Sequence, residues 1–154
     1  MITIPYFSQE RPESCVPACL RMALAAFGLE RSENDLYICC ETYIDGTLPS
    51  AVVRCAQRLG FSASAQRLSS IEQFQAILAA QSTIAIAFVN LAPLLGITVI
   101  HAIVVESIPP LEEEQLSVLD PAYPPRGHRQ WSIDLFKIGW QLARNQVILI
   151  SRTA

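Results

Sequence analysis

Residues 8–22, SQERPESCVPACLRM, place a cysteine where a polar loop turns into an apolar helix. Proline is tolerated in the first turn of a helix but not in its interior. Pro17 therefore indicates that the helix begins within a residue or two of Cys15, and the pattern predicts a helix over 15–27. Arg21 is its only charged residue, and a helix that is apolar almost all round is usually buried. We expect this helix to run through the middle of the fold.

The place of Cys15 makes it the candidate nucleophile among the cysteines. A helix N-terminus supplies partial positive charge and free N–H groups, and both favour a reactive thiolate. Cys19 lies one turn further along and should be buried. The five cysteines are odd in number and no signal-peptide pattern opens the sequence, so we expect no disulfide framework and mostly buried thiols at the other four, Cys19, Cys39, Cys40 and Cys55.

Composition excludes several classes of function. The chain has 154 residues, which predicts a single domain over 1–154. Its 11 basic residues are scattered and the net charge is −3, which argues against a nucleic-acid partner. Its longest apolar stretches are shorter than the roughly 20 residues of a spanning helix, so we expect a cytoplasmic protein without a membrane segment. No C-x-x-C pair accompanies the 2 histidines, so we expect neither a zinc site nor another cofactor.

Helical patterns dominate the first half of the sequence and β-branched runs the second half, which predicts an α+β fold with a mostly antiparallel sheet. Ser32, Thr47 and Ser69 are the predicted N-caps of three further helices, the last in a capping box with Glu72. The predicted helices cover 33–40, about 48–59, about 70–80 and 132–143, and the predicted strands cover 2–7, 61–68, 83–89, 97–106, 115–119 and 146–151.

Two predicted strands bring a histidine and a carboxylate together. A hairpin centred on the loop over 107–114 would pair residues whose numbers sum to about 221, which sets His101 opposite Asp120. A cysteine nucleophile needs such a histidine, and the histidine needs an orienting group. His128, in a loop rich in proline and charge, should be solvated and without a partner. Gln9 is the amide side chain in the loop before Cys15, where it could add a second oxyanion donor to the Cys15 N–H.

These residues and their order resemble cysteine peptidase family 39. The motif Q-x5-C-x2-AC-L-x-M, then HAIVV at 101–105, then LDPA at 119–122 follow the order of that family. Its members are papain-like peptidases that cut double-glycine leaders from bacteriocins and other secreted peptides, usually as the N-terminal domain of an ABC exporter. The resemblance implies a central N-terminal helix bearing the cysteine, packed on an antiparallel sheet bearing the histidine and the aspartate.

Carried over by position, the resemblance makes Cys15 the nucleophile, His101 the general base, Asp120 the orienting carboxylate and Gln9 the oxyanion donor. It implies a peptide or protein substrate. No membrane segment or nucleotide-binding motif accompanies these residues, so association with an exporter or another protein stays open.

Three interpretations of the chemistry remain open on the sequence alone. The triad could hydrolyse a peptide, or the acyl-enzyme could be intercepted by an amine in deamidation or acyl transfer. The chain could instead be a non-catalytic module that binds a peptide or a protein. Leu91, Leu94 and Leu95, in a loop bounded by proline and glycine, would then form an exposed patch, or they could equally line a substrate groove for apolar side chains. The alternative to both, which the pattern favours, is that they close the core.

Overall fold

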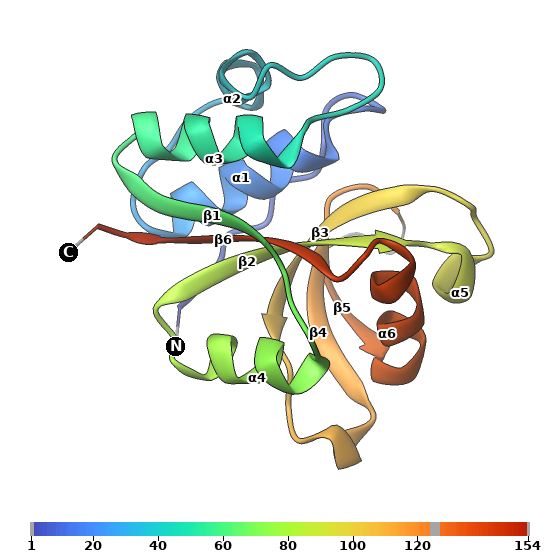
Figure 1. Cartoon of the computed structure of the whole chain (residues 1–154). Helices are drawn as coiled ribbons and strands as arrows, with labels where there is room; N and C mark the ends of the chain where they lie inside the picture. Colours follow the sequence, from blue (N-terminus) through green and yellow to red (C-terminus); the bar gives the residue numbers. More distant parts are fainter. Residues whose placement is uncertain (1, 124–126, 154) are drawn as a thin grey trace.

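The computed structural model describes residues 2–123 and 127–153, and it consists of helices packed on a six-stranded antiparallel sheet (Figure 1). The helices are α1 (Cys15–Ala26), α2 (Glu33–Cys39), α3 (Pro49–Arg58), α4 (Ile71–Ala79), α5 (Ala92–Leu95) and α6 (Ile133–Leu142). The strands are β1 (Phe61–Arg67), β2 (Thr83–Asn90), β3 (Ile100–Ser107), β4 (Gln115–Asp120), β5 (Gly127–Ser132) and β6 (Gln146–Arg152), and a 3-10 turn, η1 (Leu111–Glu113), precedes β4.

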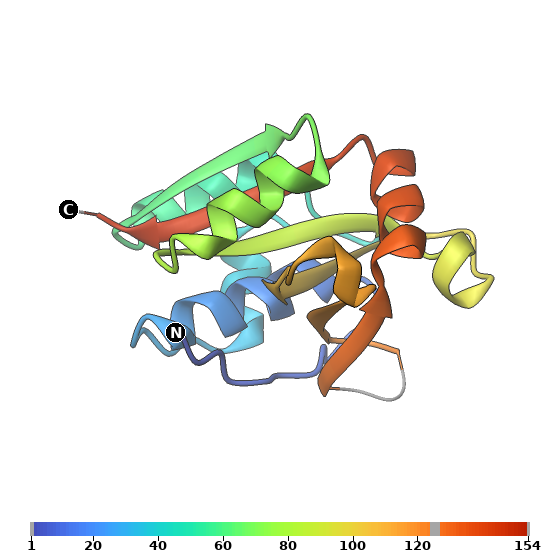
Figure 2. The same ribbon diagram turned by 90° about the horizontal axis from the view of Figure 1, so that it is seen from below.

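The strand order is β1-β6-β2-β3-β4-β5, so β2 and β3 lie inside the sheet and are buried on both faces. Alternate residues of these strands enter two apolar clusters. One cluster joins the sheet to α1, α2 and α3, and the other joins it to α4 and α6. The views in Figures 1 and 2 show these two groups of helices on opposite faces of the sheet. The α+β prediction is confirmed.

Helix α1 begins at Cys15, as Pro17 indicated, and most of its side chains are buried between the sheet and the other two helices on that face. Burial of such apolar side chains is the main stabilising contribution to a fold of this size. Arg21 is partly exposed, and its guanidinium lies 3.9 Å from the centre of the Phe7 ring. The helix that carries Cys15 is therefore fixed along nearly its whole length.

Several local predictions are wrong. Residues 2–7 form no strand in the described part of the chain, since Pro5 removes a ladder donor at the middle of this short segment. The cap of α3 is Leu48 rather than Thr47, whose hydroxyl lies 2.7 Å from that of Thr42. Ser70 rather than Ser69 caps α4, by accepting a hydrogen bond from the N–H of Gln73. Strand β5 and the short helix α5 lie in segments that the sequence pattern predicts as loops.

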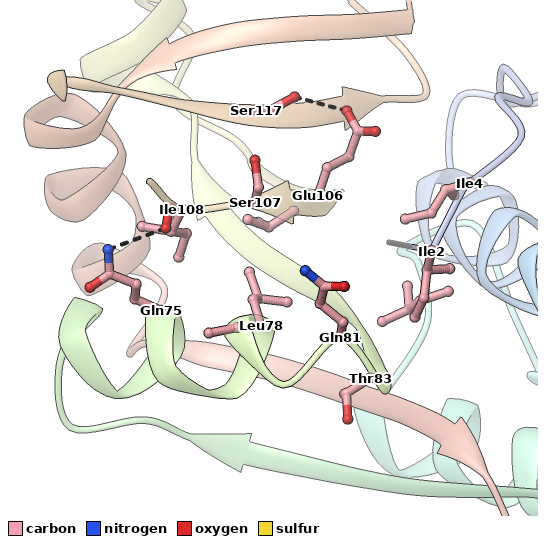
Figure 3. A pocket seen from close by; sticks show the side chains of 13 residues that line it. Ile2, Ile4, Gln75, Leu78, Gln81, Thr83, Glu106, Ser107, Ile108 and Ser117 are labelled. Atoms are coloured by element: carbon pink, nitrogen blue, oxygen red, sulfur yellow. Dashed lines mark hydrogen bonds between the residues drawn. The ribbon is translucent and has the colours of Figure 1, made fainter. Parts of the chain in front are cut away.

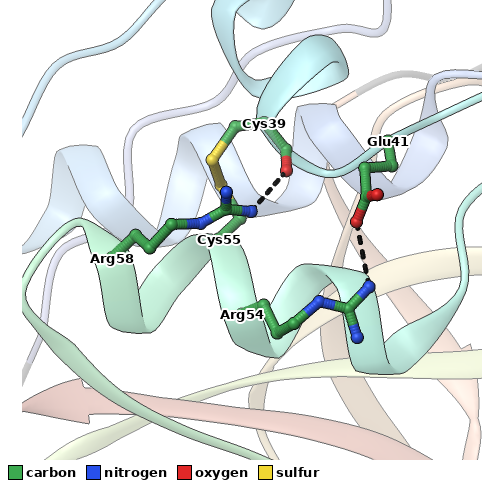
Figure 4. The surroundings of a disulfide bond; sticks show 5 residues. All are labelled: Cys39, Glu41, Arg54, Cys55 and Arg58. Atoms are coloured by element: carbon green, nitrogen blue, oxygen red, sulfur yellow. Dashed lines mark hydrogen bonds and ion pairs between the residues drawn. A yellow bond between two sulfur atoms is a disulfide. The ribbon is translucent and has the colours of Figure 1, made fainter.

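The expectation of unpaired cysteines is also wrong, because the structure joins Cys39 and Cys55 in a disulfide (Figure 4). The two Cα atoms are 5.5 Å apart, a separation that a disulfide spans. The bond links the end of α2 to α3, and Arg58 of α3 also donates to the carbonyl of Cys39 at 3.3 Å. An odd cysteine count argues against a framework of disulfides, but it carries no information on whether two helices bring one pair together.

Reduction of this disulfide should lower the free energy of unfolding by about 3 kcal/mol, because the bond closes a loop of 16 residues in the unfolded chain. Urea unfolding with and without a reductant measures the difference. The Cys39→Ser/Cys55→Ser double variant is the matched control, and it should equal the reduced protein and show no response to reductant. An unchanged midpoint on reduction would contradict the pairing.

Candidate active site

Three side chains predicted for the site come together from three elements. Cys15 is the first residue of α1 and is partly exposed, whereas His101 near the start of β3 and Asp120 at the end of β4 are buried. His101 Nε2 lies 2.8 Å from Asp120 Oδ1. The Cys15 side chain interacts with the imidazole of His101 closely enough to raise its pKa. Since Nε2 faces Asp120, Nδ1 is the ring nitrogen left for the thiol, and the imidazole bridges Cys15 and Asp120.

The contact between His101 and Asp120 is the predicted one, but the predicted strand register is wrong by two residues. Val104 pairs with Leu119 and Val105 with Val118, so the paired numbers sum to 223 rather than 221. The register also shifts between Val105 and Ser107. A shift of two residues keeps every side chain on its original side of the strand pair, and diagonal neighbours with long side chains still meet.

The site is charged in its resting form. Burial alone would lower the pKa of His101, but the hydrogen bonds and charges of Asp120 and Cys15 outweigh it and raise this pKa to about 9. Burial acts in the opposite direction on Asp120, where the hydrogen bonds from His101, Ala122 and Tyr123 hold the pKa of the carboxyl below its ordinary value. At neutral pH the pair is therefore an imidazolium and a carboxylate.

Asp120 is completely buried, and donors surround both of its oxygens. Oδ1 accepts from the N–H of Ala122 at 2.9 Å and of Tyr123 at 3.2 Å, in addition to the contact with His101. Oδ2 accepts from Arg129 Nη1 at 3.1 Å. Sequence reasoning missed Arg129 because its segment has the composition of a loop. The segment GHRQWS contains one large apolar residue, Trp131, so its sequence carries no alternating strand signal.

The fourth predicted residue, Gln9, lies beside the site with its amide group already engaged. Its backbone N–H donates to the carbonyl of Pro121 at 2.9 Å, which joins the loop to the end of β4. Its side-chain Nε2 donates to the carbonyls of Arg11 at 2.8 Å and Pro12 at 3.1 Å. Its Oε1 is buried and has no hydrogen-bond partner among the described residues. An oxyanion role for Gln9 stays a prediction that requires one amide N–H to turn toward the substrate.

Helix α2 holds this loop in place. The carboxylate of Glu33, which is 2% exposed, accepts the N–H of Glu10 at 3.0 and 3.1 Å with its two oxygens. Tyr37 donates its hydroxyl to Glu13 at 2.8 Å. Because the same helix ends at the disulfide, the segment that leads into Cys15 is tied through α2 to α3. Burial raises the pKa of Glu33, as expected for a carboxylate removed from water.

The remaining candidates lie outside this arrangement. His128 is exposed as predicted, but its Nδ1 lies 2.8 Å from the carboxylate of Glu106, so it does have a partner. Leu91 is fully buried, and Leu94 and Leu95 are partly buried against the core, so these leucines close the core rather than form an exposed patch.

A cavity of about 270 Å³ lies between the N-terminal segment, α4 and the ends of β2, β3 and β4 (Figure 3). Its lining contains none of Cys15, His101 and Asp120, so it is separate from their site. Within residues 2–123 and 127–153, no group of three or more His, Cys, Asp or Glu side chains is arranged to hold a metal ion. No helix in those ranges is long and apolar enough to cross a bilayer.

Solved structures share this fold across nearly the whole chain. The peptidase domain of Streptococcus ComA, a bifunctional ABC transporter involved in quorum sensing, has a TM-score of 0.77 at 21% identity, with 98% of this chain and 100% of that chain covered. A double-glycine-motif protease of an AMS/PCAT transporter, solved with its leader peptide, has a TM-score of 0.75 at 18% identity, with 99% and 94% covered. A C39-like peptidase from Bacillus anthracis has a TM-score of 0.79 at 14% identity, with 100% and 97% covered.

A helix that begins at a cysteine and packs on an antiparallel sheet with a histidine and an aspartate defines a papain-like cysteine peptidase. Residues 3–154 match the model of the Peptidase C39 family, and the chain belongs to that family. Comparison with curated protein sequences gives no match. The resemblance seen in the sequence is thereby confirmed for the family, the fold and the cysteine-peptidase class.

Proposed function

We propose that this peptidase cleaves a peptide with Cys15 as nucleophile, His101 as general acid and base, and Asp120 as the group that orients the imidazole. The observation that carries the proposal is the His101 imidazole, which is hydrogen-bonded to the buried carboxylate of Asp120 and interacts with the Cys15 side chain. That is the arrangement in which a histidine can move a proton to and from a nucleophile without turning.

The reaction follows from this geometry. The sulfur of Cys15 attacks the carbonyl carbon, and the C=O electron pair moves onto oxygen. Collapse of this intermediate breaks the C–N bond, and the departing amine takes the proton that His101 carries. Water then attacks the thioester while His101 removes its proton, and the thiolate leaves as the carboxylic acid forms. The Cys15 N–H, at the helix N-terminus, is the first donor to the oxyanion.

The substrate that we propose is a secreted peptide with a double-glycine leader. One of the similar solved structures is a double-glycine-motif protease in complex with its leader peptide. Exposed apolar side chains between the end of α2 and the start of α3, and from the residues before β3 to its first residue, could receive the apolar residues of such a peptide. Figures 1 and 2 place both segments at the end of the molecule where α1 begins. The exposed residues are Ile38, Tyr43, Ile44, Leu48, Ile97, Val99 and Ile100.

The proposal also covers the domain organisation of the protein, its location and its link to an exporter. We propose that residues 1–154 form one peptidase domain that works in the cytoplasm on a peptide bound for an exporter, since one similar structure is the peptidase domain of an ABC transporter.

A synthetic leader–cargo peptide tests the substrate class. Cleavage after Gly-Gly, read by mass spectrometry, should be lost when the two glycines are replaced by alanines. A glycinamide acceptor added to the same reaction separates hydrolysis from acyl transfer, because transfer yields a peptide extended by that amine. Equal cleavage of the Gly-Gly and Ala-Ala peptides would contradict the proposed substrate, and a dominant transfer product would contradict hydrolysis.

Gln9→Ala should lower kcat by about 10²–10³-fold with little change in KM, because the lost donor acts on the oxyanion and not on the bound peptide. Gln9→Glu is the matched control that keeps the side-chain length and removes the N–H donors, and it should be as poor as the alanine variant. If both variants lose stability while kcat is unchanged, Gln9 only holds the carbonyls of Arg11 and Pro12.

A further inference from the structure

Arg129 is a partly buried charge that the proposed reaction does not use. Strand β5 pairs it with Val118, two residues before Asp120 on the neighbouring strand β4, so both side chains lie on the same side of the strand pair. The Arg129 side chain is 11% exposed, and its Nη1 lies 3.1 Å from Asp120 Oδ2. The same nitrogen donates to the carbonyl of Tyr123 at 3.1 Å.

The bonds to Asp120 divide between its two oxygens. His101 and the N–H groups of Ala122 and Tyr123 all meet Oδ1, whereas Arg129 supplies the described bond to Oδ2. A carboxylate held at one oxygen can still rotate about its Cβ–Cγ bond, and a charged donor on the other oxygen opposes that rotation. Hydrogen bonds from charged donors are also stronger than neutral ones.

Arg129 also balances the charge of the site. In the form that attacks a carbonyl, the thiolate of Cys15 and the carboxylate of Asp120 carry two negative charges, and the imidazolium of His101 carries one positive charge. The guanidinium brings the sum to zero. Leaving one buried negative charge without compensation is costly, because water cannot reach the carboxylate to solvate it.

We infer that Arg129 is a positioning residue of this peptidase, which holds Asp120 ionised and oriented so that the His101 imidazole stays aligned with Cys15. The inference rests on the proposed roles of those three residues. The other titratable groups described around the pair are Cys19 of α1, Tyr6 of the N-terminal segment, whose hydroxyl donates to the Asp120 carbonyl, and Tyr123, whose ring meets His101 edge-on.

The competing explanation is that Arg129 only supports the fold. Its guanidinium lies 5.7 Å from the centre of the Trp131 ring, and its bond to the Tyr123 carbonyl ties β5 to the turn after β4. A purely structural arginine would affect stability when replaced, but it would leave the pH dependence of the reaction unchanged.

Two variants separate these roles. Arg129→Met removes the charge and keeps an unbranched apolar stem over Trp131, whereas Arg129→Lys keeps the charge and loses the guanidinium fork. We expect Arg129→Met to lower kcat by about 10–100-fold with KM within about 3-fold, as for partners that orient a functional side chain. Removing a positive charge favours protonated imidazole, so the decline of kcat/KM at alkaline pH should move upward from about pH 9 in Arg129→Met. In Arg129→Lys the alkaline decline of kcat/KM should stay at the parental pH, and most of the parental kcat should be recovered.

The rate of Cys15 alkylation by iodoacetamide against pH gives a readout that needs no substrate. Its pH profile should change in Arg129→Met and not in Arg129→Lys, even if the leader peptide proves to be the wrong substrate. Parental kcat and parental alkylation profiles in folded Arg129→Met would overturn the inference. If circular dichroism shows that Arg129→Met does not fold, Arg129→Gln takes its place, because it also removes the charge but keeps an N–H donor for the Tyr123 carbonyl. A kcat lowered by about 10-fold or more with a changed alkylation profile supports the positioning role, and parental values of both overturn it.

Discussion

Cys15→Ala should reduce kcat/KM for peptide cleavage by on the order of 10⁴–10⁶-fold, since loss of a triad nucleophile removes covalent catalysis and leaves only binding and oxyanion stabilisation. Cys15 is partly exposed at the first residue of α1, so the substitution creates no large cavity and the fold should persist. Initial rates on the leader–cargo peptide, with circular dichroism as a check of folding, measure this effect.

Cys19→Ala is the matched control, because Cys19 lies on the same helix one turn further along and is fully buried. Burial raises its thiol pKa well above the ordinary value, which keeps the sulfur protonated and unreactive. The activity of the Cys19→Ala variant should stay within about 3-fold of the parent, as expected for a side chain away from the reacting atoms. Activity that survives in Cys15→Ala and disappears in Cys19→Ala would reverse the assignment of the nucleophile.

Asp120→Asn should lower kcat/KM by about 10²–10⁴-fold, because the amide cannot hold the imidazolium as the carboxylate does. It should also move the alkaline decline of kcat/KM to lower pH. Asp120 is the main group that raises the pKa of His101 to about 9, so without its charge this pKa falls toward the ordinary value of 6.5. A pH–rate profile of parent and variant measures the shift, and an alkaline decline at the same pH in both would contradict the assigned partner.

The free energy of unfolding should also depend on pH through His101 and Asp120. The folded protein raises the pKa of His101 above its unfolded value, so the stability that this gives is fully present below about pH 6.5 and is lost as pH rises through about 9. Asp120 has a lowered pKa, so its stabilising effect is present above its ordinary value of 3.8 and is lost as pH falls further. Urea midpoints across pH should show the alkaline loss in the parent and not in His101→Gln.

The sequence predictions that the structure confirms depend on strong local patterns, such as a proline in the first turn of a helix. Pro17 limited where α1 could begin, and an apolar helix of that length had to be buried, so the place of Cys15 followed. The pairing of His101 with Asp120 survived a wrong register because an error of two residues leaves every side chain on the same side of the strands. A register error of one residue would have separated them.

The features that the sequence did not reveal depend on contacts between distant segments. The Cys39–Cys55 disulfide requires α2 to end beside α3, and Arg129 reaches Asp120 because β5 pairs with β4. Nothing in the local pattern around Glu33 predicts that its carboxylate is buried and accepts a hydrogen bond from the backbone N–H of Glu10. Such contacts follow from the way the elements pack, which periodicity and capping signals do not encode.

Iodoacetamide alkylation across pH, with mass-spectrometric mapping of the modified cysteines, shows whether Cys15 and His101 form a reactive pair. Because an adjacent imidazolium stabilises a thiolate, Cys15 should be alkylated selectively below about pH 8, where ordinary thiols are mostly protonated. His101→Gln should remove the labelling of Cys15 below pH 8, while the buried Cys19 and Cys40 stay unlabelled in both proteins. Labelling of Cys15 that stays slow below pH 8 and is unchanged by His101→Gln would show that the two residues form no reactive pair.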